Sequence, residues 1–406
     1  MEAVTNQAAW AQGGANAAPV SAAPAPSPAP VPAGPAPASQ QEALPLEGAD
    51  VRPKWLDRGR IPALDGLRAI SIALVFLEHG GDATGYHAPG IMRRVVGTIG
   101  TVGVDVFFAI SGFLITLLLL RELHRTERIS LKGFYVRRFL RLMPAAIVFL
   151  LTVLVMQGLG RGGTMTGRNW LHVVTYTVNF DPHATWVTGH LWSLSIEEQF
   201  YLLWPVALVL LGPRRAGIGA VAWLLGAPVV RFVMLRLHPH DMGRFDNWTP
   251  IRVDCIAAGC LLALVAGNAE FRRRTRASAP AAMLLIAGAI ALIFLSFLAG
   301  LRVAVYGVTV GQSVRALCIS ALIWFSINHA ETVWGRLLEW KPFVIVGVLS
   351  YSLYLWQQPF LAPKGQAWVS SPLHGLILAV SAAILSYVFV ERPFLRLKDR
   401  LDRRHA

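Results

Sequence analysis

The chain has 406 residues, of which 54% are hydrophobic and only 15% are charged, and its formal net charge is +14. Soluble domains usually carry about 25% charged residues, so this composition argues against a soluble fold. In a membrane protein an excess of Lys and Arg is typical of cytoplasmic loops. We therefore predict membrane lipids as partners and no nucleic acid.

A low-complexity segment rich in Ala and Pro opens the chain and includes APAPSPAPVPAGPAPA. Such a segment buries too little apolar surface to offset the entropy lost on ordering. We predict a disordered cytoplasmic tail over residues 1–57. It lacks the basic start and the uninterrupted apolar stretch of a signal peptide.

Apolar blocks of roughly 20 residues follow, the length that crosses the hydrocarbon core of a bilayer. They predict an all-α fold, a polytopic bundle of about ten transmembrane helices, within one domain at residues 58–395. The approximate ranges of the predicted spans are 61–79, 101–120, 143–158, 197–211, 216–235, 251–267, 280–299, 310–328, 343–361 and 373–391.

The distribution of basic residues predicts the orientation of this bundle. With the N-terminus inside, the inner segments from residue 51 onward hold 25 Lys plus Arg, and the outer loops hold 8. Cytoplasmic loops carry such an excess. We predict a multi-pass protein of the inner membrane with both termini in the cytoplasm, including a basic tail at residues 396–406.

The first span carries two groups that are expensive inside a membrane and are therefore candidates for function. Arg68 and His79 stand eleven residues apart, close to three helical turns, so both project from one face about 16 Å apart. This spacing suits a long molecule held by the cation at an anionic part and met by the imidazole, acting as base, at its reacting end. Alternatively, His79 is an interfacial residue and Arg68 snorkels.

The second span contains Asp105 one turn from its start. An unpaired carboxylate there would cost several kcal/mol, so we expect an arginine partner, for which Arg68 is a candidate. A structural ion pair and a catalytic role both fit this residue. Gly112, farther along the same span, allows close approach of another helix.

Two arginines stand at the predicted cytoplasmic mouth of the third span, in FYVRRFLRLMP. Arg138 and Arg141 are at i and i+3, so they are neighbours on one helical face. Paired guanidiniums clamp phosphates well. The alternative is an ordinary anchor of the positive-inside kind.

The fourth span opens with HLWSLSIEEQFYLLWP, which places Ser193, Ser195, Glu197 and Glu198 before an apolar run. Ser195 followed by Glu198 resembles a capping device that starts a helix. Alternatively, one of the two carboxylates orients His79, as in a catalytic dyad.

Further polar groups occur in the sixth and ninth spans. Arg252 and Asp254 are two residues apart and cannot face each other on a helix, so each needs another partner. Tyr351, Tyr354 and Gln357 step by three and form one polar stripe, or they belong to the aromatic belt of the interface. The three cysteines lie inside apolar blocks without a CxxC motif, and we predict no metal site.

In their combination and order these segments resemble the acyltransferase 3 family of membrane acyltransferases. The matching pieces run from residue 61 to 394 and read LDGLRAISIALVFLEH, GVDVFFAISGFLIT, FYVRRFLRLMP, HLWSLSIEEQFYLLWP, TPIRVDCIAAG, YSLYLWQQP and VERPF. A single piece would be a weak signal, whereas the ordered set is specific.

The resemblance implies an enzyme that moves an acyl group, with acetyl expected first, from cytoplasmic acyl-coenzyme A to a carbohydrate hydroxyl. It implies that His79 is the general base and that Arg68, in the same helix, is also a catalytic residue and helps to bind the donor. It also implies that Arg138 and Arg141 bind acyl-coenzyme A, and that Glu197 or Glu198 is functional. The remaining candidates, expected to support substrate or structure, are Asp105, Ser193, Arg252, Asp254, Tyr351, Tyr354 and Gln357.

The expected acceptor is a cell-envelope polysaccharide or a lipid-linked glycan. Some members of the family carry a fused extracytoplasmic domain, and only a short tail follows VERPF here. Either a separate extracytoplasmic transferase completes transfer, or the acceptor is modified directly. The alternatives are acylation with succinyl or a longer chain, acylation of a small molecule such as a macrolide, and glycan or lipid transport without acyl transfer. The sequence specifies neither the acceptor nor the oligomeric state.

Overall fold

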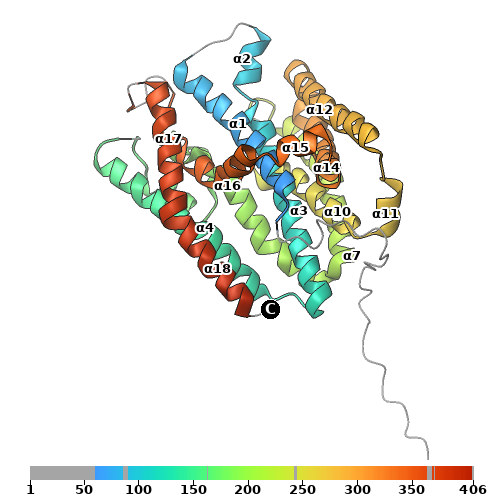
Figure 1. Cartoon of the computed structure of the whole chain (residues 1–406). Coiled ribbons are helices and arrows are strands. Elements are labelled where there is room, and N and C mark those ends of the chain that lie inside the picture. The colour runs from blue at the N-terminus through green and yellow to red at the C-terminus, as the bar shows by residue number, and fades with distance from the viewer. Residues whose placement is uncertain are drawn as a thin grey trace, which may run out of the picture. The chain divides into compact units, whose positions relative to one another are not determined.

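A computed structural model describes residues 60–85, 90–161, 163–241, 245–363, 368–369 and 371–404. The tail predicted at residues 1–57 lies outside this range. All the regular structure in these ranges is helical, with no strand (Figure 1). The all-α prediction is therefore confirmed for the part of the chain that the structure describes.

The helices follow one another along the chain with these bounds: α1 (Pro62–Thr84), α2 (Ile91–Val96), α3 (Gly100–Thr126), α4 (Leu131–Gly158), α5 (Gly167–Val174), η3 (Val178–Phe180), α6 (Trp186–Gly189), α7 (Leu191–Leu237), α9 (Thr249–Arg252), α10 (Asp254–Ala266), α11 (Ala269–Arg274), α12 (Ala279–Arg302), α13 (Ala304–Tyr306), η4 (Gly307–Gly311), α14 (Gln312–Asn328), α15 (Val333–Leu338), α16 (Lys341–Trp356), α17 (Pro372–Ser386), η5 (Tyr387–Glu391) and α18 (Arg392–Arg404).

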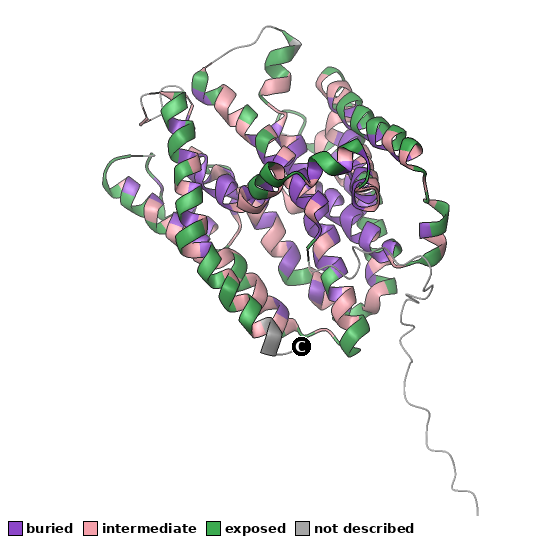
Figure 2. Ribbon diagram, viewed as in Figure 1, coloured by how far each residue is buried: buried purple, intermediate pink, exposed green. Residues whose placement is uncertain are grey.

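Six helical stretches in the described residues are long and apolar enough to cross a membrane: Met92–Thr126, Leu131–Gly158, Trp186–Leu237, Ala279–Arg302, Ala304–Asn328 and Pro372–Leu401. The helices α10 and α16 are shorter but also apolar. Large hydrophobic side chains are exposed on the outward faces of several of these helices, including Leu284 at 76% and Leu210 at 74% (Figure 2). Lipid tails solvate such faces without penalty, so the chain is a multi-pass membrane protein.

The helix α7 is interrupted where the sequence predicted the boundary between the fourth and fifth spans. Gly212 has φ 73° and ψ 164°, a conformation that is strained for a residue with a Cβ, and Pro213 follows it directly. Glycine tolerates this backbone and proline lacks the amide hydrogen that would continue the ladder. The two predicted spans therefore lie on either side of one break.

The helices α3 and α10 cross closely because a glycine on each helix lies directly against the backbone of the other. Gly112 of α3 lies against the carbonyl oxygen of Ile256, and Gly259 of α10 lies against that of Ala109. A Cβ at either glycine would overlap this backbone. Small residues bring membrane helices together in this way, so the close approach expected at Gly112 is confirmed.

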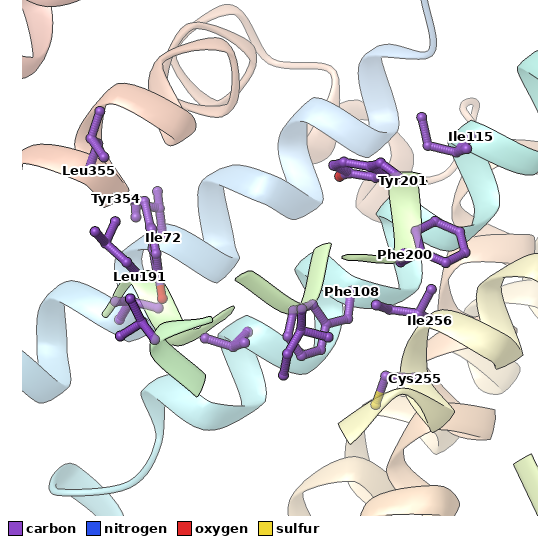
Figure 3. Close-up of a cluster of buried hydrophobic side chains, with 14 of the residues drawn as sticks. Ile72, Phe108, Ile115, Leu191, Phe200, Tyr201, Cys255, Ile256, Tyr354 and Leu355 are labelled. Atoms are coloured by element: carbon purple, nitrogen blue, oxygen red, sulfur yellow. The ribbon is translucent and has the colours of Figure 1, made fainter. Parts of the chain in front are cut away.

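A buried apolar cluster fills the space between α1, α3, α7, α10 and α16 (Figure 3). Phe108 of α3 and Ile256 of α10 are 1% and 0% exposed at its centre. In Figure 3, Tyr354 and Tyr201 lie toward opposite sides of the view, with Phe108 between them. Four of these helices, α1, α3, α7 and α16, also contribute polar side chains to the site described next.

Candidate active site

A cavity of about 80 Å³ lies among α1, α3, α4, α7 and α16 and is partly open to its surroundings. The polar residues of its wall come from all five helices: Arg68, Ser111, Arg138, Arg141, Ser193, Glu197, Tyr201, Ser350, Tyr351 and Tyr354. Charged groups are rare inside a membrane bundle and mark substrate or ion sites there. This cavity is therefore the candidate site.

Three arginines line the cavity. Arg138 and Arg141 come from α4, as their spacing predicted, and Arg68 of α1 joins them. The Arg138 guanidinium lies over the Tyr201 ring, 3.8 Å from its centroid, a cation–π contact that fixes its place. Arg68 has a carboxylate neighbour one turn back, since its Nη1 lies 3.8 Å from Oδ1 of Asp65. The Arg141 side chain is exposed.

One of the two predicted glutamates faces the same cavity. Ser111 Oγ donates a hydrogen bond to Glu197 Oε1 at 2.6 Å, and the Tyr201 hydroxyl donates to Ser111 Oγ at 3.1 Å. The charged side chains of this lining are thus three arginines and a single glutamate. The excess of positive charge makes the cavity suited to an anion.

The start of α7 differs from the capping that the sequence suggested. The helix begins at Leu191, and Ser195 Oγ donates to the Leu191 carbonyl at 2.9 Å. Ser195 is therefore inside the helix, and its interpretation as a cap is wrong, because α7 starts four residues earlier. Glu198 is half-buried and is not part of the cavity lining.

A layer of buried hydroxyls lies in the cavity wall near the start of α7. The hydroxyls of Ser193 and Tyr354 lie 2.6 Å apart, and the Tyr354 hydroxyl donates to the His190 carbonyl at 3.0 Å. Tyr351 also lines the cavity and donates to the Leu142 carbonyl at 2.8 Å. The tyrosines of the predicted stripe thus belong to the cavity.

His79 lies beyond this layer and is not part of the cavity lining. Its Nδ1 is 2.9 Å from Oε1 of Gln357, and its ring meets Trp186 edge-on with centroids 5.4 Å apart. Along α1, Asp65 lies against Gly347 and His79 meets Gln357, so α1 packs against α16 and the residues directly after it. In the described structure an amide, and not Glu197 or Glu198, is the hydrogen-bond partner of Nδ1.

The partner proposed for Asp105 is corrected by the structure. Asp105 Oδ2 lies 3.2 Å from Nη2 of Arg315, and its Oδ1 lies 3.7 Å from Nη1 of Arg252. Arg68 is not its partner, because α14 and the α9 segment bring two other arginines to α3. Asp105 is fully buried and outside the cavity lining, so this contact is an internal ion pair of the bundle.

Asp254 has a partner of its own, as the two-residue spacing from Arg252 predicted. Its Oδ2 accepts from Nη2 of Arg231 at 2.8 Å and from Ser313 Oγ at 2.6 Å. Both charged side chains are at most 1% exposed. Removing one member of such a pair leaves an uncompensated buried charge, so the network ties α7, α10 and α14 together.

Sequence reasoning did not single out His190 and Gln358, which connect the hydroxyl layer to His79. His190 directly precedes the LWSLS segment, and Gln358 adjoins Gln357 but falls off the three-residue stripe. Neither residue belongs to a regularly spaced set of polar residues, so the sequence pattern did not reveal it. Within the described residues no group of three or more His, Cys, Asp or Glu could hold a metal ion.

Apolar helices around an arginine-rich cavity, with a hydrogen-bonded histidine beyond it, define an integral membrane protein with a positively charged internal cavity. The sequence profile of the acyltransferase 3 family, described as an acyltransferase domain, matches residues 61–391. The chain belongs to this family.

Two relatives illustrate the similarity. The O-acetyltransferase OatA of Staphylococcus aureus strain NCTC 8325 is 29% identical over 359 residues. A putative O-acetyltransferase of S. aureus strain COL is 29% identical over 364 residues. Each alignment covers 82% of this chain and 57% of the relative, so the chain spans little more than half the length of these relatives. No solved structure gives a significant match.

Proposed function

We propose that the chain is an O-acyltransferase that moves an acyl group, acetyl first, from cytoplasmic acyl-coenzyme A to a hydroxyl of a carbohydrate. The observation that carries this proposal is the convergence of Arg68, Arg138 and Arg141 on one cavity inside the bundle. The names of the two relatives support O-acetyl transfer. The proposed acceptor is a cell-envelope polysaccharide or a lipid-linked glycan.

The proposal includes ten crossings of the inner membrane, with both termini in the cytoplasm. The two parts of α7 on either side of Gly212 count as separate crossings, and α1 and the shorter apolar helices α10 and α16 supply the remaining three. The bias of Lys and Arg supports this orientation. Figure 1 also places the ends of α3 and α18 at the same end of the bundle, where both would meet the cytoplasm.

The arginines would hold the phosphates of the donor near the cytoplasmic end of the bundle. A guanidinium presents its donors in a planar fork that matches phosphate oxygens. Glu197 offsets part of the repulsion among the three cations while the cavity is empty. With its phosphates there, the flexible arm of coenzyme A would point its thioester along α1 toward His79, about 16 Å from Arg68.

In the chemical step His79 acts as general base. Its unprotonated ring nitrogen takes the proton of the acceptor hydroxyl while the hydroxyl oxygen attacks the thioester carbonyl carbon. The tetrahedral intermediate collapses, the carbon–sulfur bond breaks, and the imidazolium returns the proton to the leaving thiolate. The products are the sugar ester and free coenzyme A, so the histidine ends as it began and no metal takes part.

The test uses the full chain in lipid nanodiscs with acetyl-coenzyme A and a carbohydrate acceptor. Release of the free thiol and the mass of the acceptor are followed together. His79→Ala should abolish both signals, whereas His238→Ala, in the exposed loop after α7, should leave them unchanged. Full transfer by a well-folded His79→Ala protein would refute the assignment.

Two other outcomes identify the alternatives. Thiol release with an unmodified acceptor indicates that a separate extracytoplasmic transferase accepts the acyl group, and adding that protein should complete transfer. Movement of a glycan or lipid across the bilayer without thiol release would instead make the chain a transporter and overturn the proposal.

A further inference from the structure

Two adjacent glutamines follow α16 and reach two different histidines. Gln357 is 0% exposed and Gln358 is 5% exposed. The side chain of Gln357 contacts His79, whereas that of Gln358 lies between His190 and His79. Buried amides of this kind have fixed donor and acceptor ends, so their contacts determine where protons reside.

The orientation of the Gln358 amide is determined by a backbone group. Its Oε1 accepts from the backbone N–H of His190 at 3.0 Å. A backbone N–H can only donate, so the oxygen of the amide has to face it. The His190 ring lies on the same oxygen, with Nδ1 at 2.8 Å, and its Nε2 lies 3.1 Å from the Leu355 carbonyl oxygen. The amide nitrogen of Gln358 therefore points the other way, toward His79.

This orientation decides the tautomer of His79. Nε2 of Gln358 lies 3.5 Å from Nε2 of His79, and an amide nitrogen can only donate. This contact favours a lone pair on the imidazole Nε2, which leaves the ring proton on Nδ1. Nδ1–H donates in turn to Gln357 Oε1 at 2.9 Å. Gln357 alone would not decide this, because its own Nε2 has no hydrogen-bond partner in the described structure.

We propose that Gln358 and Gln357 are positioning residues that hold His79 in the Nδ1–H tautomer. The lone pair of Nε2 is then ready to take the proton of the acceptor hydroxyl. This inference rests on the proposed function for its chemical meaning. A 3.5 Å contact is at the limit of hydrogen bonding, so an incoming hydroxyl displaces it easily. The Gln357 oxygen also accepts a hydrogen bond from the imidazolium that forms during the reaction. The carboxylate of a serine-protease triad has the same role.

The direct test reads the tautomer by nuclear magnetic resonance of the full chain, labelled with 15N-histidine, in nanodiscs at alkaline pH. Signals that disappear in His79→Gln belong to His79. The wild type should show protonated Nδ1 and unprotonated Nε2, and Gln358→Met should move the proton at least partly to Nε2. Gln312→Met, at a buried glutamine of α14, is the matched control and should leave the His79 signals unchanged.

Kinetics give a second readout. A positioned base contributes about 100- to 10,000-fold to a rate, so Gln357→Met should lower kcat about 10- to 100-fold. Gln357→Glu, which keeps an oxygen acceptor for Nδ1–H, should restore most of that loss. Coenzyme A binding and thermal unfolding, measured on each variant, show that the protein is folded.

The inference and the proposed function fail separately. Transfer that survives in His79→Ala removes the proposed function, while the resonance measurement still reports the tautomer. A wild-type protein with the proton on Nε2 of His79 overturns the inference. An unaltered tautomer in the Gln358→Met protein would also overturn it. So would transfer at the wild-type rate by both the Gln357→Met and the Gln358→Met proteins.

Discussion

Replacing Arg138 or Arg141 by glutamine is expected to weaken the binding of coenzyme A. Both residues line the cavity, but their surroundings differ. Arg138 is half-buried against the Tyr201 ring, whereas the Arg141 side chain is exposed. Glutamine keeps a polar side chain and removes the charge, so the change isolates the attraction for phosphate.

The size of the effect follows from these surroundings. A hydrogen bond to a charged group contributes about 1.5–3 kcal/mol, and each 1.4 kcal/mol is tenfold in Kd. Arg141→Gln should therefore raise Kd about tenfold or more. Arg138→Gln, which also removes the guanidinium held by the Tyr201 ring, should raise Kd by about 30- to 100-fold.

The assay is a titration of the purified protein in nanodiscs with coenzyme A and with its 3′-dephospho form. If the arginines hold phosphate, the wild type prefers the complete molecule and the variants lose part of this preference. Arg273→Gln is the matched control. Arg273 lies on α11 with 79% of its side chain exposed and pairs with Glu270, so its loss should change Kd by less than about twofold.

Unchanged affinity for coenzyme A in both variants would refute the reasoning, provided that the proteins are folded. The two arginines would then be anchors at the cytoplasmic side of the membrane and nothing more. Equal weakening by Arg273→Gln would also contradict it, because the effect would then come from overall charge and not from the cavity.

Three further outcomes are expected. Asp105→Asn should destabilise the protein by about 3–5 kcal/mol, seen as a lower Tm, because it leaves buried guanidiniums uncompensated. Gly112→Val should cost about 1–3 kcal/mol or more by forcing α10 away, whereas Gly219→Val, with open space around it, should unfold like the wild type. Tyr201→Phe keeps an aromatic ring under Arg138 and should bind coenzyme A within about twofold of the wild type, while Tyr201→Leu should bind it several-fold more weakly.

The helices and the inner arginines could be predicted because their signals are local. Apolar length identifies most of the long helices. The i, i+3 spacing of Arg138 and Arg141 places them on one face, and the same face then lines the cavity. The eleven-residue spacing likewise placed Arg68 and His79 along one helix. Each of these inferences needs only the geometry of a single helix.

The partners of buried polar groups could not be predicted, because they depend on which helices are neighbours. Asp105 pairs with Arg315, 210 residues later, and His79 meets Gln357, 278 residues later. A sequence reveals that a carboxylate in a span needs a cation but not which one supplies it. The start of α7 was misplaced for a different reason: the predicted span began at residue 197, inside the polar SLSIEE segment, whereas the helix already begins at Leu191.

The hydroxyl layer formed by Ser193 and Tyr354 bears on the electrical integrity of the membrane. A cell that stores energy as an ion gradient loses it through any continuous water column from one side to the other. Ser193 and Tyr354 lie in the wall of the arginine-lined cavity, and their hydrogen bond joins α7 to α16 there. A donor path between these two helices, as in the proposed reaction, would have to break this hydrogen bond, and the donor would then need to exclude water itself if the ion gradient is to be kept.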